Sequence, residues 1–312
     1  MSIPDQTFTK VSYFKISAAQ EGQRIDNFLL KTYKTVPKSK IYKIIRKGEV
    51  RVNKGRIKPE YKLKIEDTVR LPPIAVSNKD NTPVFIPKDV LDTMEKSIVF
   101  ENDHFFVLNK PYGLAVHSGT GLSYGVVDVL KRLRPNQMVE LVHRLDRDTS
   151  GCLMFAKSRK ALVMLQNMLK QSQINKTYIA MVVGQWPAKQ KVLDFPLKKY
   201  LMQNGEKRVR VEKGGQMALT KVLKVQANKK FSLLTLRLIT GRTHQIRVHC
   251  QSVGHSIIND DKYGNREDDK QLKKYGFNRM MLHAKTLNIE SNELCEAVEI
   301  SAPVPEVFNK KL

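Results

Sequence analysis

The segment VHRLDRDTSG, residues 142–151, places two acids, two arginines and a histidine between two apolar stretches of the chain. Apolar runs at 141–142 and 152–155 flank it, and short apolar runs bounded by Asp, Thr, Ser and Gly are typical of strands joined by a turn. The segment is therefore either a polar turn in a strand pair or a catalytic loop that two strands present.

Similar short apolar runs recur through the rest of the chain. They predict strands at 98–100, 105–108, 141–142, 153–155, 178–183, 218–225, 231–239 and 280–289. Helical periodicity is present at 126–133, at 161–169 after Ser158, and at 243–253 before Gly254, and Val90, Leu91 and Met94 indicate a short helix. Because strands with hairpin-like neighbours outnumber helices, we expect an α+β domain with a mostly antiparallel, mixed sheet and helices packed on it.

The composition is that of a soluble, basic protein. The chain has 312 residues, and 55 Lys and Arg against 30 Asp and Glu give a net charge of +25. Such a surplus favours a polyanionic partner, of which nucleic acid is the first candidate, although a merely basic surface remains possible on charge alone.

Cysteine usage and hydrophobicity bear on the cellular compartment. The three cysteines, Cys152, Cys250 and Cys295, are far apart and have no metal-ligand spacing, so neither a disulfide framework nor a zinc site is implied. We find no signal-peptide pattern at the start and no apolar run that approaches a membrane span. A cytoplasmic protein without a membrane partner is expected.

Positive charge is concentrated in residues 24–70, which contain 15 Lys or Arg and 5 Asp or Glu. Ile41, Ile44 and Ile45 recur at helical spacing and predict a buried face, while basic residues occupy the other faces. Short strands around Val52 and Val69 would complete a helix-plus-hairpin module. The positions predicted to contact RNA are Lys38, Ser39, Lys40, Lys43, Arg46, Lys47, Arg51 and Asn53.

This module resembles the S4 domain of ribosomal proteins and RNA-modifying enzymes, in its helix opened by Ser and Lys and in the sequence VRVN at 50–53. The resemblance implies structured RNA as partner. We predict an N-terminal extension at 1–20, a small α/β S4-like domain at 21–73, a linker at 74–96 and the α+β domain at 97–312.

Several other site patterns fail on spacing. GLSYG at 121–125 matches a hydrolase nucleophile elbow, with Asp146 and His244 in the right order, but no buried strand precedes it. The same glycines are spaced one residue too widely for a dinucleotide fingerprint, and HRLD places its acid one position later than the HRD of a kinase catalytic loop. No histidine motif suggests a metal, so no metal is expected, and His143, His249 and His283 are predicted to be structural.

Asp146 is the strongest candidate for a reacting group. It lies between Arg144 and Arg147 in a tight loop, and a neighbouring cation favours the ionised form of a carboxylate, which suits a nucleophile or a base. Asp148 precedes Thr-Ser-Gly and is predicted only to shape the turn.

HRLDRDTSG at 143–151 and GRTHQIRVH at 241–249 resemble the two motifs of the RluA-type pseudouridine synthases, and they occur in the expected order. Supporting segments are LNKPYGLAVH at 108–117, NKTYIAMVVG at 175–184, DDKYG at 260–264 and MLHA at 281–284. The resemblance implies the pseudouridine synthase fold, no cofactor, and 23S rRNA or the large-subunit precursor as partner of an enzyme expected to be a monomer.

The resemblance also implies roles for individual residues. Asp146 would be the catalytic aspartate, Tyr178 would stack on the uracil, and Arg247 would form an ion pair with Asp146. Arg144 would act on the flipped base or its replacement in the RNA, and Leu282 would pack beneath the base. His244 and Arg242, in the second motif, are expected to bind substrate. Asn259 is a departure, because many relatives have Gly before DDKYG.

Two alternatives stay open at the level of sequence. Asp146 could attack the sugar, attack the base or abstract a sugar proton, because the three routes need the same residues. A non-catalytic RNA-binding ribosome-assembly factor, with a structural Asp146–Arg247 pair, is the alternative function.

Overall fold

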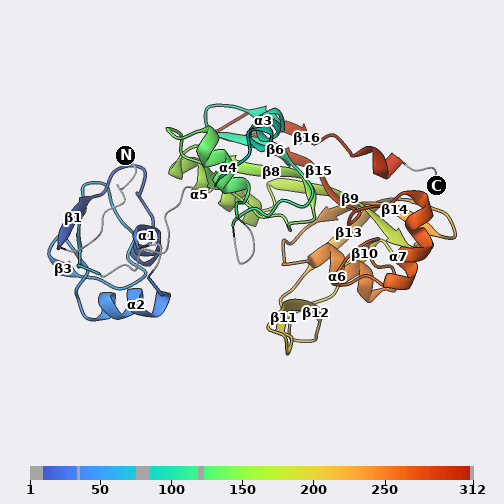
Figure 1. Ribbon diagram of the computed structural model, residues 1–312, viewed down its shortest axis with the longest axis horizontal. Coiled ribbons are helices and arrows are strands. Elements are labelled where there is room, and N and C mark those ends of the chain that lie inside the picture. Colours follow the sequence, from blue (N-terminus) through green and yellow to red (C-terminus); the bar gives the residue numbers. More distant parts are fainter. Residues whose placement is uncertain (1–9, 34–35, 75–84, 119–122, 310–312) are drawn as a thin grey trace. The chain divides into compact units, whose positions relative to one another are not determined.

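The computed structural model describes residues 10–33, 36–74, 85–118 and 123–309. The chain forms two compact units, Met1–Val84 and Phe85–Leu312, each with its own core (Figure 1). Of the GLSYG segment, Gly121 and Leu122 lie outside the described residues.

The first unit is a small sheet with two helices. Its strands are arranged in the order β1-β4-β2-β3, and all pairs are antiparallel. The elements are β1 (Ser12–Lys15), α1 (Ile25–Thr32), α2 (Lys38–Arg46), β2 (Arg51–Val52), β3 (Gly55–Arg56) and β4 (Thr68–Leu71).

Helix α2 confirms the predicted amphipathic pattern. Ile41, Ile44 and Ile45 are buried against the sheet residues Val52 and Val69, and the helix begins after Pro37. Proline suits this place because its fixed φ is compatible with a helix start and its missing N–H is not needed there. One face of α2 is therefore core, and the basic face is left to solvent.

The structure differs from the predicted boundaries in two places. β1 lies within the predicted N-terminal extension, yet Ser12 to Lys15 pair with β4 and Ile16 is buried in the first unit's core. Helix α3 (Lys88–Lys96) lies within the predicted linker, yet its Met94 is 1% exposed in the core of the second unit. Each segment carries few apolar residues, and the short helix that Val90, Leu91 and Met94 indicated within the linker is confirmed by α3.

The second unit is built on a ten-stranded, mixed sheet, which agrees with the expected α+β class. Its main order is β10-β13-β14-β9-β15-β8-β6-β5, and only the β15–β8 pair is parallel. The strands are β5 (Ile98–Glu101), β6 (Phe105–Lys110), β7 (Glu140–Leu141), β8 (Ser150–Ala156), β9 (Ile174–Val183), β10 (Val192–Asp194), β13 (Leu219–Ala227), β14 (Phe231–Leu238), β15 (Leu282–Ile289) and β16 (Val298–Ser301). All the predicted strands are present.

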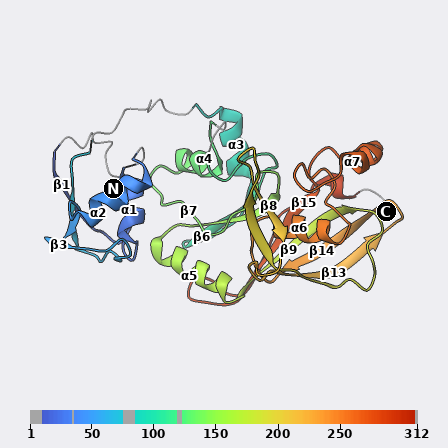
Figure 2. The ribbon, with the colours of Figure 1, turned by 90° about the horizontal axis from the view of Figure 1, so that it is seen from below.

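Helices cover both faces of the β6–β8 part of this sheet (Figure 2). On β6, Phe106 and Leu108 join the cluster that holds α3 and α4 (Val126–Leu133), whereas Phe105 and Val107 join the cluster of α5 (Arg159–Lys170). This alternation follows from the two-residue period of a strand. Helix α5 is capped by the predicted Ser158, whose hydroxyl accepts a hydrogen bond from the Ala161 N–H at 3.2 Å.

Helix α1 and strands β10 and β16 were not predicted, and neither were several further elements. The further elements are the hairpin β11 (Leu197–Leu201) and β12 (Lys207–Val211), helix α7 (Arg266–Leu272), and the two 3-10 turns Lys273–Tyr275 and Glu306–Asn309. Helix α6 (Gln245–Ser252) starts two residues later than predicted, because His244 has a φ of +53° and cannot be part of it.

The parallel β15–β8 pair fixes where the HRLDRDTSG loop leaves the sheet. Gly151, at the start of β8, has a φ of +106°, and a side-chain Cβ there would lie 2.1 Å from the Ala284 carbonyl oxygen of β15. Only glycine permits so close a backbone approach. Glycine at the end of the loop is thus required by strand packing.

Candidate active site

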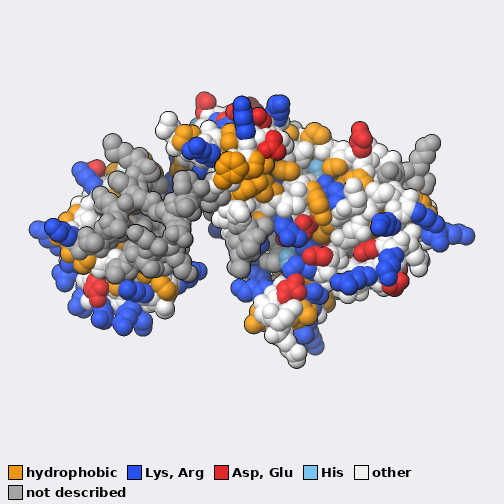
Figure 3. Space-filling model, viewed as in Figure 1, with side chains coloured by type: hydrophobic (Ala, Val, Ile, Leu, Met, Phe, Trp, Pro, Cys, Tyr) orange, Lys and Arg blue, Asp and Glu red, His pale blue; other side chains and the backbone are white. Residues whose placement is uncertain are grey.

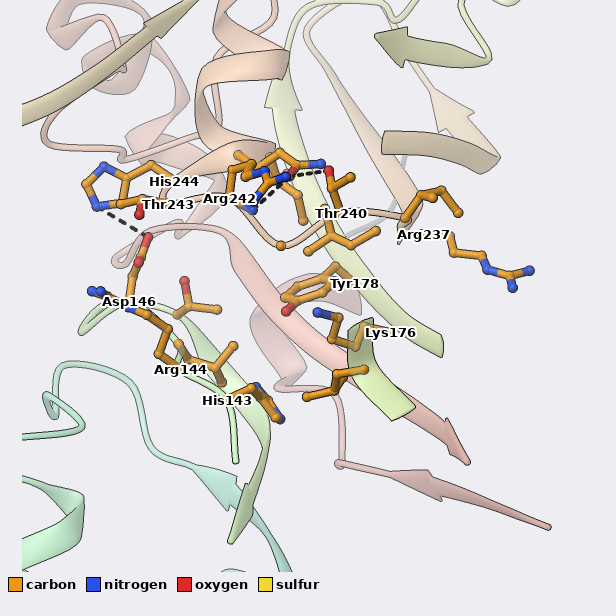
Figure 4. A pocket seen from close by; sticks show the side chains of 18 of the residues that line it. His143, Arg144, Asp146, Lys176, Tyr178, Arg237, Thr240, Arg242, Thr243 and His244 are labelled. Carbon is orange, nitrogen blue, oxygen red and sulfur yellow. Dashed lines mark hydrogen bonds and ion pairs between the residues drawn. The ribbon is translucent and has the colours of Figure 1, made fainter. Parts of the chain in front are cut away.

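A pocket of about 550 Å³ lies where the HRLDRDTSG loop, β9, β15 and the residues before α6 meet. This volume suits one nucleotide-sized group. The pocket is lined by every residue that the sequence predicted for catalysis or substrate binding, namely Asp146, Tyr178, Arg247, Arg144, Leu282, His244 and Arg242. Figure 4 shows Asp146, Arg144, Tyr178, Arg242 and His244, which come from different elements.

The expected ion pair between Asp146 and Arg247 is present. The Arg247 Nη1 donates to Asp146 Oδ2 at 3.0 Å, and the two residues are 101 positions apart in sequence. Arg247 is 3% exposed in the first turn of α6, while the Asp146 side chain is 19% exposed at the pocket wall. A buried guanidinium therefore holds a carboxylate that solvent and substrate can still reach.

Arg247 is itself fixed by a residue that the sequence-based assignment did not single out. The Asp260 carboxylate accepts hydrogen bonds from Arg247 Nε at 2.7 Å and from Nη2 at 2.6 Å, in a bidentate arrangement. Asp261 accepts a third at 3.2 Å, and the guanidinium lies over the Tyr263 ring. These partners belong to the DDKYG segment, which was the available signal for them. The bidentate pair orients Arg247 so that Nη1 is directed at Asp146.

Asn259 resolves the departure noted in the sequence. Its φ is +57°, in the left-handed region where Gly is favoured and Asn is among the residues best tolerated. Its N–H donates to Asp269 Oδ1 at 2.8 Å and its side-chain amide donates to the Arg279 carbonyl at 3.2 Å. The turn that places Asp260 is thus maintained without glycine.

His244 lies on the other side of Asp146. Its Nε2 is 3.8 Å from Asp146 Oδ2 (Figure 4). Its Nδ1 is 2.7 Å from the Tyr263 hydroxyl. Burial lowers the pKa of His244, which favours the neutral ring. A neutral imidazole at this distance leaves Arg247 as the cationic partner of Asp146.

Tyr178 and Leu282 form the apolar part of the pocket. Tyr178 is on β9 and Leu282 is the first residue of the adjacent β15, and both are at most 6% exposed. Burial, assisted by the nearby Asp146 carboxylate, raises the pKa of the Tyr178 hydroxyl above its usual range, so the ring is neutral. An aromatic ring and a leucine on neighbouring strands can enclose a planar base.

Lys176 is a second residue that the sequence-based assignment did not single out. It lies two residues before Tyr178 on β9 and lines the same pocket, beside Tyr178 in Figure 4. Burial lowers the pKa of the Lys176 ammonium.

His143 is a neutral residue of the same pocket. Burial, and then the charge of Lys176, lower the pKa of His143 to about 3. Its Nε2 accepts a hydrogen bond from the Met154 N–H at 3.4 Å.

The two neighbours of Asp146 do not pair with it. Arg147 forms its ion pair with Asp148 at 3.0 Å, which also means that Asp148 is held by a side chain rather than acting only as a turn cap. Arg144 is exposed at the pocket rim. Arg242, also at the rim, donates from Nε to the Met217 carbonyl at 3.0 Å. Both rim arginines are accessible to a ligand.

Lys110 holds the backbone of the HRLDRDTSG loop through a hydrogen bond. It is fully buried, and its ammonium donates to the carbonyl oxygens of Pro111 at 2.8 Å, Leu114 at 2.8 Å and Arg147 at 2.9 Å. Burial lowers the pKa of Lys110 to about 7, whereas the three acceptors use all three ammonium hydrogens and so favour the charged form. The contact to Arg147 anchors the backbone next to Asp146.

The predicted structural histidines are hydrogen-bonded within the fold. His249 Nδ1 is 3.1 Å from the Thr220 hydroxyl and its Nε2 is 3.0 Å from the Phe195 carbonyl. His283 Nδ1 is 2.8 Å from the Ser150 hydroxyl. Within the described ranges no cluster of three or more His, Cys, Asp or Glu could hold a metal ion.

The eight predicted RNA-contact residues are all exposed on the first unit. Basic side chains gather along the edge of this unit where α2 lies (Figure 3). Asn53 is different, because its side chain is used inside the unit: Oδ1 accepts from the Thr68 N–H at 2.9 Å and Nδ2 donates to Asp67 at 2.8 Å.

None of the helices among the described residues is both long and apolar enough to cross a membrane.

Comparison with known proteins bears on the family. The RNA pseudouridylate synthase family matches residues 104–252, and the S4 domain matches residues 23–69. The chain is 47% identical to ribosomal large subunit pseudouridine synthase C of Pasteurella multocida, over 97% of this chain and 93% of that protein. The chain belongs to the RNA pseudouridylate synthase family.

Other members of this family give the same picture. The Escherichia coli ribosomal large subunit pseudouridine synthase C is 48% identical over 97% of this chain and 96% of that protein. Among solved structures, human RNA pseudouridylate synthase domain containing 4 superposes with a TM-score of 0.59 at 26% identity, covering 71% of this chain and 94% of that chain. The synthase motifs and the pocket thus lie within the region shared with the family.

Proposed function

We propose that this protein converts specific uridines of 23S rRNA, in the precursor of the large ribosomal subunit, to pseudouridine, with Asp146 as the reacting acid. The observation that carries the proposal is the Asp146 carboxylate, held 3.0 Å from the buried Arg247 guanidinium in the pocket that Tyr178 and Leu282 also line. Relatives nearly half identical over almost the full chain are named for the same activity on the large subunit.

The proposed reaction needs the groups that the pocket supplies. The bond between uracil N1 and sugar C1′ breaks, a bond between C5 and C1′ forms, the C5 hydrogen leaves as a proton, and N1 gains a proton. Product and substrate are isomers, so no co-reactant is consumed. Asp146 acts as nucleophile or base, and the pocket walls retain the detached uracil while it turns.

The target uridine has to leave its stack to reach Asp146. Arg144 and Arg242 at the pocket rim are placed to contact the displaced nucleotide and its phosphates, and Lys176 offers a further cation inside the pocket. All these groups come from one chain, which supports action as a monomer.

The proposal is tested by mapping pseudouridines in rRNA with carbodiimide and primer extension. A strain that lacks this gene is expected to lose one or more stops in 23S rRNA, and the wild-type gene, but not the Asp146→Asn gene, is expected to restore them. An unchanged stop pattern combined with an altered subunit-assembly profile would contradict the proposal and favour a non-catalytic assembly factor.

A further inference from the structure

The sheet of the first unit carries an aromatic ring and three arginines in one row across its four strands. Tyr13 of β1 lies opposite Arg70 of β4. Arg70 in turn lies opposite Arg51 of β2, and Arg51 lies opposite Arg56 of β3. Directly opposed residues of antiparallel strands share a face of the sheet, so these four side chains, here called the Tyr13 row, stand side by side.

The Tyr13 row is on the solvent side of the sheet. Tyr13 is 67% exposed, whereas the adjacent Phe14 packs on the unit's core. Val52 and Val69, which neighbour Arg51 and Arg70 in sequence, are at most 5% exposed in the same core. One face of the sheet therefore packs on the core of the unit. The other face exposes a large aromatic ring to solvent, and this ring does not contribute to the core.

The arginines of the row are positioned but not neutralised. Arg51 Nε donates to the Gly48 carbonyl at 3.1 Å, and Arg70 Nη1 donates to the Glu49 carbonyl at 2.5 Å. Within the described part of the unit, no ion pair joins any of the three arginines to a carboxylate. Both hydrogen bonds go to the turn that follows α2, so the row continues from the basic end of that helix.

Tyr13, Arg51 and Arg70 of the row border a cavity of about 990 Å³. Its lining residues are Tyr13, Lys47, Gly48, Glu49, Arg51, Asn53, Lys54, Thr68 and Arg70. Four of these nine are basic, and the single acid, Glu49, is 3.8 Å from Lys47. A concave, cationic surface with an exposed aromatic ring at its edge suits a polyanion that also carries planar groups.

We propose that the Tyr13 row binds a single-stranded segment of RNA, with Tyr13 stacking on an unpaired base and the arginines contacting neighbouring phosphates. A paired base has no free face for this stacking, whereas an unpaired base does. The choice of RNA as the polymer that binds here rests on the proposed function. It adds a site, because Tyr13 and Arg70 lie outside the residues 23–69 that match the S4 domain.

The test is binding of the full chain to a fluorescent single-stranded RNA and to a duplex of equal length, measured by anisotropy. Tyr13→Ala is expected to weaken single-strand binding about fivefold or more, from the stacking of one base, and to leave duplex binding within about twofold. Tyr13→Phe, which keeps the ring, is expected to bind like the wild type. Phe85→Ala removes an exposed aromatic from the second unit and is the matched control.

A charge variant gives an independent readout. Arg56→Gln is expected to reduce the slope of log affinity against log salt for single-stranded RNA by about 0.7, the value for one phosphate contact. Wild-type single-strand affinity for Tyr13→Ala, or an equal loss on duplex, would overturn the proposal and point to a protein partner or to a general charge effect. Binding is measured without turnover, so this failure is distinct from an absence of pseudouridine formation.

Discussion

Two groups of arginines, one in each unit, lie in different surroundings. In the second unit, Arg247 is 3% exposed and its guanidinium contacts three carboxylates, two of them in the DDKYG segment and the third that of Asp146. In the first unit, Arg51, Arg56 and Arg70 have no carboxylate partner within the described residues. The first arrangement fixes one atom precisely enough for chemistry, and the second leaves charge available for a ligand.

The two arrangements should also affect different properties of the protein, namely the stability of the fold and the affinity for a ligand. A buried charge that loses its partner destabilises the fold strongly, whereas an exposed cation mainly contributes to binding and to its salt dependence. Substitutions that remove a buried partner of Arg247 should therefore change folding and turnover together. Substitutions of exposed cations in the first unit should change RNA affinity alone.

Asp260→Asn should have the largest effect of the substitutions considered. It leaves Arg247 buried with only Asp146 and the 58%-exposed Asp261 as acidic partners. We expect a loss of about 3 kcal/mol in the free energy of unfolding and a large drop in pseudouridine formation. Urea unfolding followed by Trp186 fluorescence reports on this unit, because Trp186 is the chain's single tryptophan and is buried there. Asp103→Asn, an exposed acid, is the control; an equal midpoint for both variants would refute the expectation.

Loss of stability through histidine protonation should also belong to the second unit, since all seven histidines lie after residue 103. Burial lowers the pKa of His283 to about 4 from the usual 6.5, so the folded state binds fewer protons than the unfolded state between these values. Stability is then fully present above pH 6.5 and is lost as pH falls towards 4, by up to about 3 kcal/mol from this group.

Replacing His283 by Asn should reduce the difference in unfolding free energy between pH 7 and pH 4.5, without abolishing it, because the pKa of His143 is also lowered, to about 3. The exposed His104→Asn variant is expected to keep the wild-type difference. The expectation fails if His283→Asn and His104→Asn have the same pH profile.

The smallest effects are expected on α2. Lys40→Gln and Lys43→Gln remove exposed charges, so each should change the free energy of unfolding by less than about 0.5 kcal/mol. Each should lower the salt slope of RNA binding by about 0.7 to 0.9 if it contacts a phosphate. Titration of RNA at several salt concentrations, with thermal unfolding in parallel, measures both. An unchanged slope would mean that this face is only solvated surface.

Much of the fold could be predicted because its apolar patterns are regular. Helix α4 begins and ends where the periodicity predicted, and each apolar run of the second unit became a strand. The hairpin β11–β12 was not predicted, because its sequences LKKYL and KRVRV are highly charged and show little alternation of apolar and polar residues. Helix α7, REDDKQL, buries only Leu272 and so leaves almost no apolar signal.

The site was predictable in part for a different reason. The resemblance paired Asp146 with Arg247 across a hundred residues, which no local pattern could do. It did not single out Asp260, because its role depends on a turn in which Asn259 adopts a positive φ. Lys110 was likewise hidden, because a lysine next to proline gives no indication that three carbonyl oxygens surround it.

We propose Asp146 as the reacting group and Arg247 as the residue that orients the Asp146 carboxylate. The most direct measurement is tritium release from 5-labelled uridine in a 23S rRNA fragment by the Asp146→Asn variant, with the dissociation constant for the same fragment measured in parallel. We expect release to fall by roughly 10⁴-fold or more, to background, with an unchanged dissociation constant. Release at the wild-type rate from a correctly folded variant would contradict this proposal.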